Sequence, residues 1–182
     1  MHMSKLNNAK KRKRKALLCD LLFIILLVAF DHLTKYLAVA HLKDKQAFKI
    51  INGVLELNYL ENKGAAFGML QNQGGFFVFV AIIVLGVIAY ILYKTPNDKK
   101  YNLLHILLSL IAAGAIGNMI DRLRFDYVVD FIYIILINFP IFNVADMYVS
   151  FATVILVLAL LFYYKESDLS FISFNQKKYR EL

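Results

Sequence analysis

Four long apolar runs dominate the chain, and each is long enough to cross a bilayer as a helix, which takes about 20 mostly apolar residues. The first carries Asp20, Asp31 and Lys35, whereas the other three contain no Asp, Glu, Lys or Arg. The sequence therefore predicts an all-α membrane protein with four transmembrane helices, placed at about 17–41, 76–93, 101–120 and 147–164. A basic tail at 1–16 precedes this domain of residues 17–165, and a second tail at 166–182 follows it.

Two longer segments between the runs fit the same fold. In the outer loop, residues 42–75, the stretch Val54-Leu55-Glu56-Leu57-Asn58-Tyr59 alternates apolar and polar residues after the turn signal Asn52-Gly53. We expect a short strand or hairpin there, which adds a small β-containing extracytoplasmic loop to the helices. Residues 131–145 are apolar but interrupted by Asn138 and Pro140, and as a helix they would reach only about 22 Å. We expect them to belong to an outer interfacial or re-entrant segment, residues 121–146.

Composition and charge agree with a membrane protein. Of 182 residues 60% are hydrophobic and 19% charged, which argues against an ordinary soluble domain. Fourteen of the 21 basic residues lie before the first run, in the loop 94–100 or after Tyr164. Since positive charge gathers on the cytoplasmic side, both termini are predicted there, and the net charge of +8 needs no nucleic acid partner. A cleaved signal peptide ending at Ala38-Val39-Ala40 is the alternative for the first run, but Asp31 and Lys35 precede that site.

Polar residues from distant parts of the chain converge on the outer membrane boundary. Asp31 lies about 21 Å into the first helix, and Asn118, Asp121 and Arg122 end the third. Asn143 and Asp146 introduce the fourth helix. Ionisable groups at membrane depth are costly, so such a cluster indicates a functional site.

Asp130 and Asp146 are the strongest candidates for chemistry, because apolar sequence flanks both. Two carboxylates in one low-dielectric site cannot both ionise and therefore share a proton, which suits general acid and base catalysis. Proton-coupled transporters use such carboxylates too, so a small proton-linked transporter stays an alternative. Likewise, Asp31 with Lys35 could be a structural ion pair.

Some features give weaker signals. The charges around Arg122, from Asp121 to Asp126, could form only a solvated loop. The single cysteine, Cys19, excludes an intramolecular disulfide, and the four histidines show no metal-ligand spacing. We therefore expect no metal and no organic cofactor.

Four ordered blocks resemble the bacterial lipoprotein signal peptidases, the signal peptidase II family of aspartic membrane peptidases. Each block alone is weak, but their order and their place at one membrane face make the signal specific. The blocks are Asp31-His32-Leu33-Thr34-Lys35, Asn62-Lys63-Gly64-Ala65-Ala66-Phe67, Gly117-Asn118-Met119-Ile120-Asp121-Arg122 continuing to Val128-Val129-Asp130-Phe131, and Phe142-Asn143-Val144-Ala145-Asp146.

The resemblance implies an endopeptidase of the bacterial cytoplasmic membrane, with its active site at the extracytoplasmic face. It would remove signal peptides from diacylglyceryl-modified prolipoproteins, on the N-terminal side of the lipidated cysteine. By matching, the catalytic residues are Asp130 and Asp146, and the residues that bind substrate or orient the dyad are Asp31, Lys35, Asn62, Asn118, Arg122 and Asn143. Membrane lipid and the prolipoprotein are the implied partners, and a monomer is expected. A non-catalytic scaffold that binds lipoproteins remains a further alternative.

Two departures from the family pattern stand near the site. His32 replaces the usual Gln, and Asp126 stands where Gly is common. Asn and Asp tolerate left-handed backbone, so a turn at Asp126 can survive. Residues from Val54 to Phe67 resemble the family's extramembrane cradle over the active site.

Overall fold

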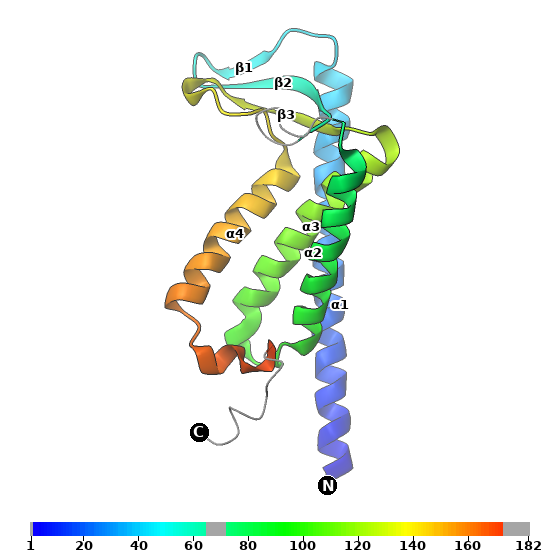
Figure 1. Cartoon of the computed structure of the whole chain (residues 1–182), viewed down its shortest axis with the longest axis vertical. Coiled ribbons are helices and arrows are strands. Elements are labelled where there is room, and N and C mark those ends of the chain that lie inside the picture. Colours follow the sequence, from blue (N-terminus) through cyan, green and yellow to red (C-terminus); the bar gives the residue numbers. More distant parts are fainter. Residues whose placement is uncertain (1, 65–71, 173–182) are drawn as a thin grey trace.

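Four helices and a small sheet make up the computed structural model, which describes residues 2–64 and 72–172. A three-stranded sheet covers one end of the helices, and the N-terminal end of α1 lies at the other (Figure 1). The helices are α1 (His2–Leu42), α2 (Gly74–Lys94), α3 (Asn102–Phe125) and α4 (Val144–Phe162). The strands are β1 (Phe48–Ile51), β2 (Leu55–Asn62) and β3 (Val128–Ile134), and the 3-10 turns are η2 (Lys99–Tyr101), η3 (Ile135–Ile137) and η4 (Glu166–Ile172).

The four predicted spans are confirmed as four helices long and apolar enough to cross a membrane. Two of them are longer than the apolar pattern indicated. Helix α1 begins at His2, so the predicted tail 1–16 is helical from that residue, and α3 continues to Phe125. Polar residues extend both helices, which a search for apolar runs does not detect.

Helix α3 lies at the centre of the bundle and packs against α1, α2 and α4. Small side chains make this close approach possible. A Cβ at Gly114 would overlap the carbonyl oxygen of Ala145, and a Cβ at Gly117 would lie 2.6 Å from Asp31 Oδ2. Ser109 and Ala113 are fully buried on the same helix. Small residues at helix interfaces are the usual means of packing in membranes, where the hydrophobic effect gives little attraction between helices.

The sheet is antiparallel in the order β1-β2-β3. The predicted hairpin is confirmed, since β1 pairs with β2 across the turn at Asn52-Gly53. Gly53 has φ of 72°, in the left-handed region that glycine adopts without strain. The turn after α3 also needs this conformation, and Asp126 provides it there with φ of 63°.

The segment after α3 contains a strand that the sequence did not predict. Residues Val128–Ile134 form a strand that pairs with β2 from Leu55↔Ile134 to Asn62↔Val128. The chain then turns through η3, and Phe142 bridges back to Ile132 before α4 begins. β2 supplies the backbone hydrogen bonds that an isolated segment at the membrane surface would lack.

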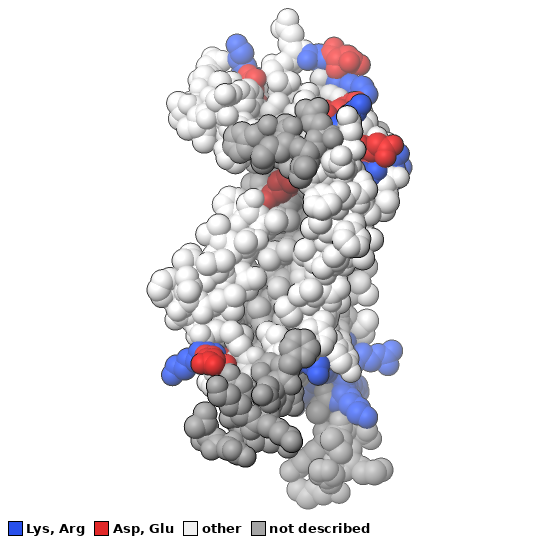
Figure 2. Space-filling view, viewed as in Figure 1, with Lys and Arg blue, Asp and Glu red and all other residues white. Residues whose placement is uncertain are grey.

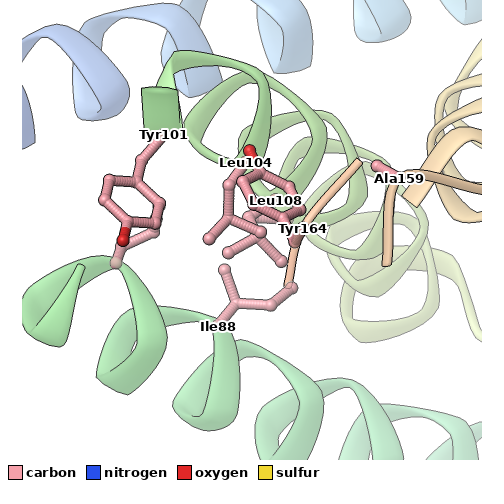
Figure 3. Packing of buried hydrophobic residues seen from close by; sticks show 8 residues of the cluster. Ile88, Tyr101, Leu104, Leu108, Ala159 and Tyr164 are labelled. Carbon is pink, nitrogen blue, oxygen red and sulfur yellow. The ribbon is translucent and has the colours of Figure 1, made fainter. Parts of the chain in front are cut away.

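At the end opposite the sheet, an apolar core joins α2, α3 and the residues after α4. Side chains of Ile88, Leu104, Leu108 and Tyr164 point toward one another (Figure 3). The ring of Tyr164 stacks on Tyr101 with centroids 6.1 Å apart.

Candidate active site

Asp130 lies in β3, where the sheet meets the helix ends, and its side chain is buried. Two amides donate to its carboxylate, Asn62 Nδ2 to Oδ2 at 2.8 Å and Asn143 Nδ2 to Oδ1 at 2.6 Å. Burial and, next in size, the negative charge of Asp146 raise the pKa of Asp130 to about 7. This carboxyl can therefore hold a proton near neutral pH.

Asp146 lies in the first turn of α4 and takes part in a reciprocal cap. Asn143 Oδ1 accepts from the Asp146 backbone N–H at 2.9 Å, and Asp146 Oδ2 accepts from the Asn143 backbone N–H at 3.1 Å. The other oxygen, Oδ1, accepts from Asn118 Nδ2 at 2.7 Å. A helix N-terminus favours a negative charge, so its position suits an ionised carboxylate.

Asn143 connects the two acids. Its side-chain Nδ2 contacts Asp130 Oδ1 and also Asn118 Oδ1, the latter at 3.1 Å, while its Oδ1 caps the helix at Asp146. The Asn143 side chain is fully buried, and both its amide nitrogen and its amide oxygen are hydrogen-bonded. It therefore fixes the position of Asp130 relative to Asp146.

A buried charged cluster lies behind the two acids. Lys35 Nζ is 2.9 Å from Asp31 Oδ2 and 2.8 Å from Asp121 Oδ2, and it donates to Asn118 Oδ1 at 2.9 Å. All three charged side chains are at most 3% exposed. The expected pairing of Asp31 with Lys35 is confirmed, and Asp121 is its unexpected third member.

The two carboxylates of this cluster hold the backbone beside each site acid. Asp31 Oδ1 accepts from the Ala145 N–H at 2.9 Å, one residue before Asp146. Asp121 Oδ2 accepts from the Val129 N–H at 3.2 Å, one residue before Asp130. We call Asp31, Lys35 and Asp121 the charged tripod, since it joins α1 and α3 to the start of α4 and to β3.

The solvated-loop interpretation fails for part of the charge run. Asp121 is buried in the tripod, and Arg122 Nη2 donates to the Gly64 carbonyl at 3.2 Å while its guanidinium lies 4.7 Å from the Phe77 ring centroid. Of the four charged residues in this run, Arg124 and Asp126 are exposed, as that interpretation expects. The sequence placed Asp121 in the boundary cluster but gave it no role in the site. Its position three residues after Asn118, on the same helix face, is the signal that could have linked it to the site residues.

Both acids line a cavity of about 470 Å³ below the sheet. Asn62, Asn118 and Arg122 contribute polar groups, and most of the remaining wall is apolar. A second hollow of about 290 Å³ runs along α3 between α2 and α4, and it shares Asn118, Arg122 and Asp146 with the first. The structure thus brings the predicted site residues together: five line the cavity, while Asn143, Asp31 and Lys35 lie behind its wall. A red, acidic patch lies between the charged side chains at the top and at the bottom of this face, with white surface below it (Figure 2).

Ala65, Ala66 and Phe67 of the second block lie outside the described residues. Asp20, to which the sequence assigned no role, pairs with His105 at 2.7 Å toward the other end of the bundle. Within the described part of the chain, no group of three or more His, Cys, Asp or Glu could hold a metal ion.

Comparison with known proteins agrees with this geometry. The family model described as signal peptidase (SPase) II matches residues 23–162, which includes all the site residues. The chain belongs to the signal peptidase II family. As a member it is a membrane peptidase that removes signal peptides.

Individual members of the signal peptidase II family show how far the similarity extends. The lipoprotein signal peptidase of Streptococcus pyogenes serotype M5 (strain Manfredo) is 43% identical over 147 residues, which cover 81% of this chain and 93% of the relative. The serotype M3 (strain ATCC BAA-595 / MGAS315) protein is 42% identical over the same length. A solved bacterial membrane enzyme, determined by the in meso method at 2.3 Å resolution, has a TM-score of 0.73 and 33% identity, covering 81% of this chain and 92% of that one.

Proposed function

We propose that this signal peptidase II family member removes signal peptides from prolipoproteins with Asp130 and Asp146 as an aspartic dyad. The observation that carries the proposal is the link through Asn143, which contacts Asp130 by its side chain and Asp146 by both side chain and backbone at one cavity. Membership of a peptidase family favours this function over a proton-linked transporter or a non-catalytic scaffold.

Hydrolysis needs one ionised and one protonated carboxyl. The ionised aspartate takes a proton from water as the water oxygen attacks the scissile carbonyl carbon, and the protonated aspartate hydrogen-bonds to the carbonyl oxygen. As the C–N bond breaks, a carboxyl proton passes to the leaving amine, so that water is divided between the two products. A pKa of about 7 for Asp130 lets the pair hold one proton near neutral pH, which leaves one carboxyl ionised and one protonated.

The position of the dyad fits a lipid-modified substrate. Asp130 and Asp146 lie where the helices end and the sheet begins, and the hollow between α2 and α4 leads from there along α3. Diacylglyceryl chains in the bilayer would hold the scissile bond, just N-terminal to the lipidated cysteine, at this level. With both termini on the cytoplasmic side, the dyad faces outward across the bacterial cytoplasmic membrane.

The proposal is tested by a gel-shift assay of the purified protein with a diacylglyceryl-modified prolipoprotein. Asp130→Asn and Asp146→Asn should each abolish the shift to the mature form. Asp126→Asn is the matched control, because Asp126 is exposed and Asn accepts its left-handed backbone, and it should cleave normally. Normal cleavage by either dyad variant would overturn the mechanism, and equal cleavage of an unlipidated precursor would remove the lipid requirement.

A further inference from the structure

A run of six basic residues, Lys10–Lys15, continues α1 beyond its apolar part. Five of the six side chains are exposed, and Lys13 is half-buried. The signal peptidase II model begins to match only at residue 23, so this run lies outside the matched region. The peptidase chemistry at the opposite end of the molecule makes no use of it.

Contacts with α2 hold this basic run in place. Lys13 Nζ donates to the Thr95 carbonyl at 3.4 Å and lies 5.1 Å from the ring centroid of Tyr93. Lys94 ends α2 beside it, 5.7 Å from the ring of Tyr90. We call Lys10–Lys15 together with Lys94 the basic collar. Blue side chains gather at this lower end of the molecule (Figure 2).

Two acidic side chains at this end have other partners. Asp168 pairs with Lys100 at 2.6 Å, and Asp20 pairs with His105 at 2.7 Å. Neither of these ion pairs includes a collar residue. The collar is thus a cluster of seven adjacent cations that can attract an external anion.

Helix geometry sets the depth of the collar in the membrane. From Asp31 back to Lys13 an α-helix rises about 27 Å, close to the thickness of the hydrocarbon core. With Asp31 at the outer boundary, Lys13 lies at the opposite one. Exposed aromatic residues at this end, Tyr93, Phe162 and Tyr163, are typical of that interface. From Lys10 to Lys15 the helix rises about 7.5 Å, comparable to one headgroup layer of about 5 to 7.5 Å.

We propose that the basic collar is a binding surface for anionic phospholipid headgroups of the cytoplasmic leaflet. Its charge is complementary to phosphate-bearing lipids such as phosphatidylglycerol, and its depth places it among them. Basic residues next to a span attract anionic lipid by about fivefold each. The anchored Lys13 gives the surface a fixed shape between α1 and α2.

The test uses the full-length protein in detergent micelles, titrated with phosphatidylglycerol or phosphatidylcholine, with bound lipid counted by native mass spectrometry. The parent should retain phosphatidylglycerol preferentially. Changing Lys10, Lys11, Arg12 and Arg14 to Gln should lower that preference at least about fivefold, and raising the salt from about 50 to 500 mM should lower it in the parent. This measurement is independent of peptidase activity.

Two control proteins keep the result specific. Changing Lys45, Lys49, Lys63 and Arg124 to Gln removes four charges at the other end and should leave lipid retention unchanged. Exchanging Lys10 and Lys11 for Arg, and Arg12 and Arg14 for Lys, keeps the charge, so this variant should retain phosphatidylglycerol as the parent does. The charge-keeping variant also provides a test if the Gln variant fails to fold. Unchanged preference in a folded Gln variant would overturn the proposal, as would displacement of phosphatidylglycerol by a single-stranded oligonucleotide.

Discussion

Charged side chains serve opposite purposes at the two ends of the bundle. At the sheet end, the charged tripod and Asp130 are buried, Asp146 is half-buried, and each tripod carboxylate holds the backbone beside one dyad acid. At the other end, the basic collar is exposed, and the buried core beneath it is apolar. Burying a charge removes its hydration, which costs free energy. Charges are therefore kept buried where they hold functional groups in a fixed position.

Removing the tripod cation should give the largest effect. Lys35→Met leaves the carboxylates of Asp31 and Asp121 without their shared cation, and breaking a buried pair costs about 3 to 5 kcal/mol. Thermal unfolding in detergent should show a large loss of stability, together with loss of cleavage. Lys43→Met is the control, because the Lys43–Glu61 pair at 2.9 Å is exposed and its loss should change little. Equal effects of the two changes would contradict the contrast between buried and exposed charge.

Asp121→Asn tests the side of the tripod that holds β3. The amide keeps the shape but loses the charge that pairs with Lys35, and Val129 then loses a strong acceptor. A displacement of Asp130 by about 1 Å can reduce catalysis about 100-fold. Steady-state cleavage should show the fall mainly in kcat, since the substrate cavity is unchanged. Asp126→Asn is the matched control, and a fall confined to KM would argue against a positioning role.

The close packing of α3 should be sensitive to one added methyl group. Gly114→Ala places a Cβ against the Ala145 carbonyl and Val149, so α4 must shift, at a cost of about 1 to 3 kcal/mol. Gly86→Ala meets open space and should not destabilise the protein. Thermal unfolding of the two variants side by side measures the difference. Unchanged stability in Gly114→Ala would show that α3 and α4 do not depend on this contact.

The pH dependence of stability and of cleavage should also change. The folded protein binds the Asp130 proton more tightly than the unfolded chain, because its pKa rises from 3.8 to about 7. The contribution of Asp130 to the free energy of unfolding is therefore fully present at low pH and decreases as pH rises from about 4 to about 7. Asp130→Asn should remove this decrease. Cleavage should also fall as pH rises above about 7, when the shared proton is lost, and a rate that keeps rising there would contradict the protonation scheme.

Much of the fold was accessible from the sequence because its signals are local. Apolar runs located the four helices, and alternation located the hairpin at Val54–Tyr59. Strand β3 was missed because its first four residues are all buried, so Val128–Ile134 shows no alternation. Its partner, β2, lies more than 60 residues away. The Asp20–His105 pair could not be predicted for a similar reason, because the two residues are 85 positions apart in the sequence.

The candidate site, too, has features that the sequence could predict and features that it could not. Asp31 and Lys35 are one helical turn apart, so their pairing could be predicted, whereas the attachment of Asp121 to Lys35 depends on how α3 packs on α1. Family motifs indicated Asn62, Asn118 and Asn143, but not which oxygen each amide contacts. Those contacts come only from the tertiary structure.

The most direct test of the account measures binding and cleavage of one lipidated prolipoprotein by the parent, Asp130→Asn and Asp146→Asn. The account predicts that both variants fold and bind the precursor as the parent does, while single-turnover cleavage falls at least about 1,000-fold, or about 4 kcal/mol in the barrier. Cleavage within about tenfold of the parent by either folded variant would contradict the assignment of Asp130 and Asp146 as the dyad.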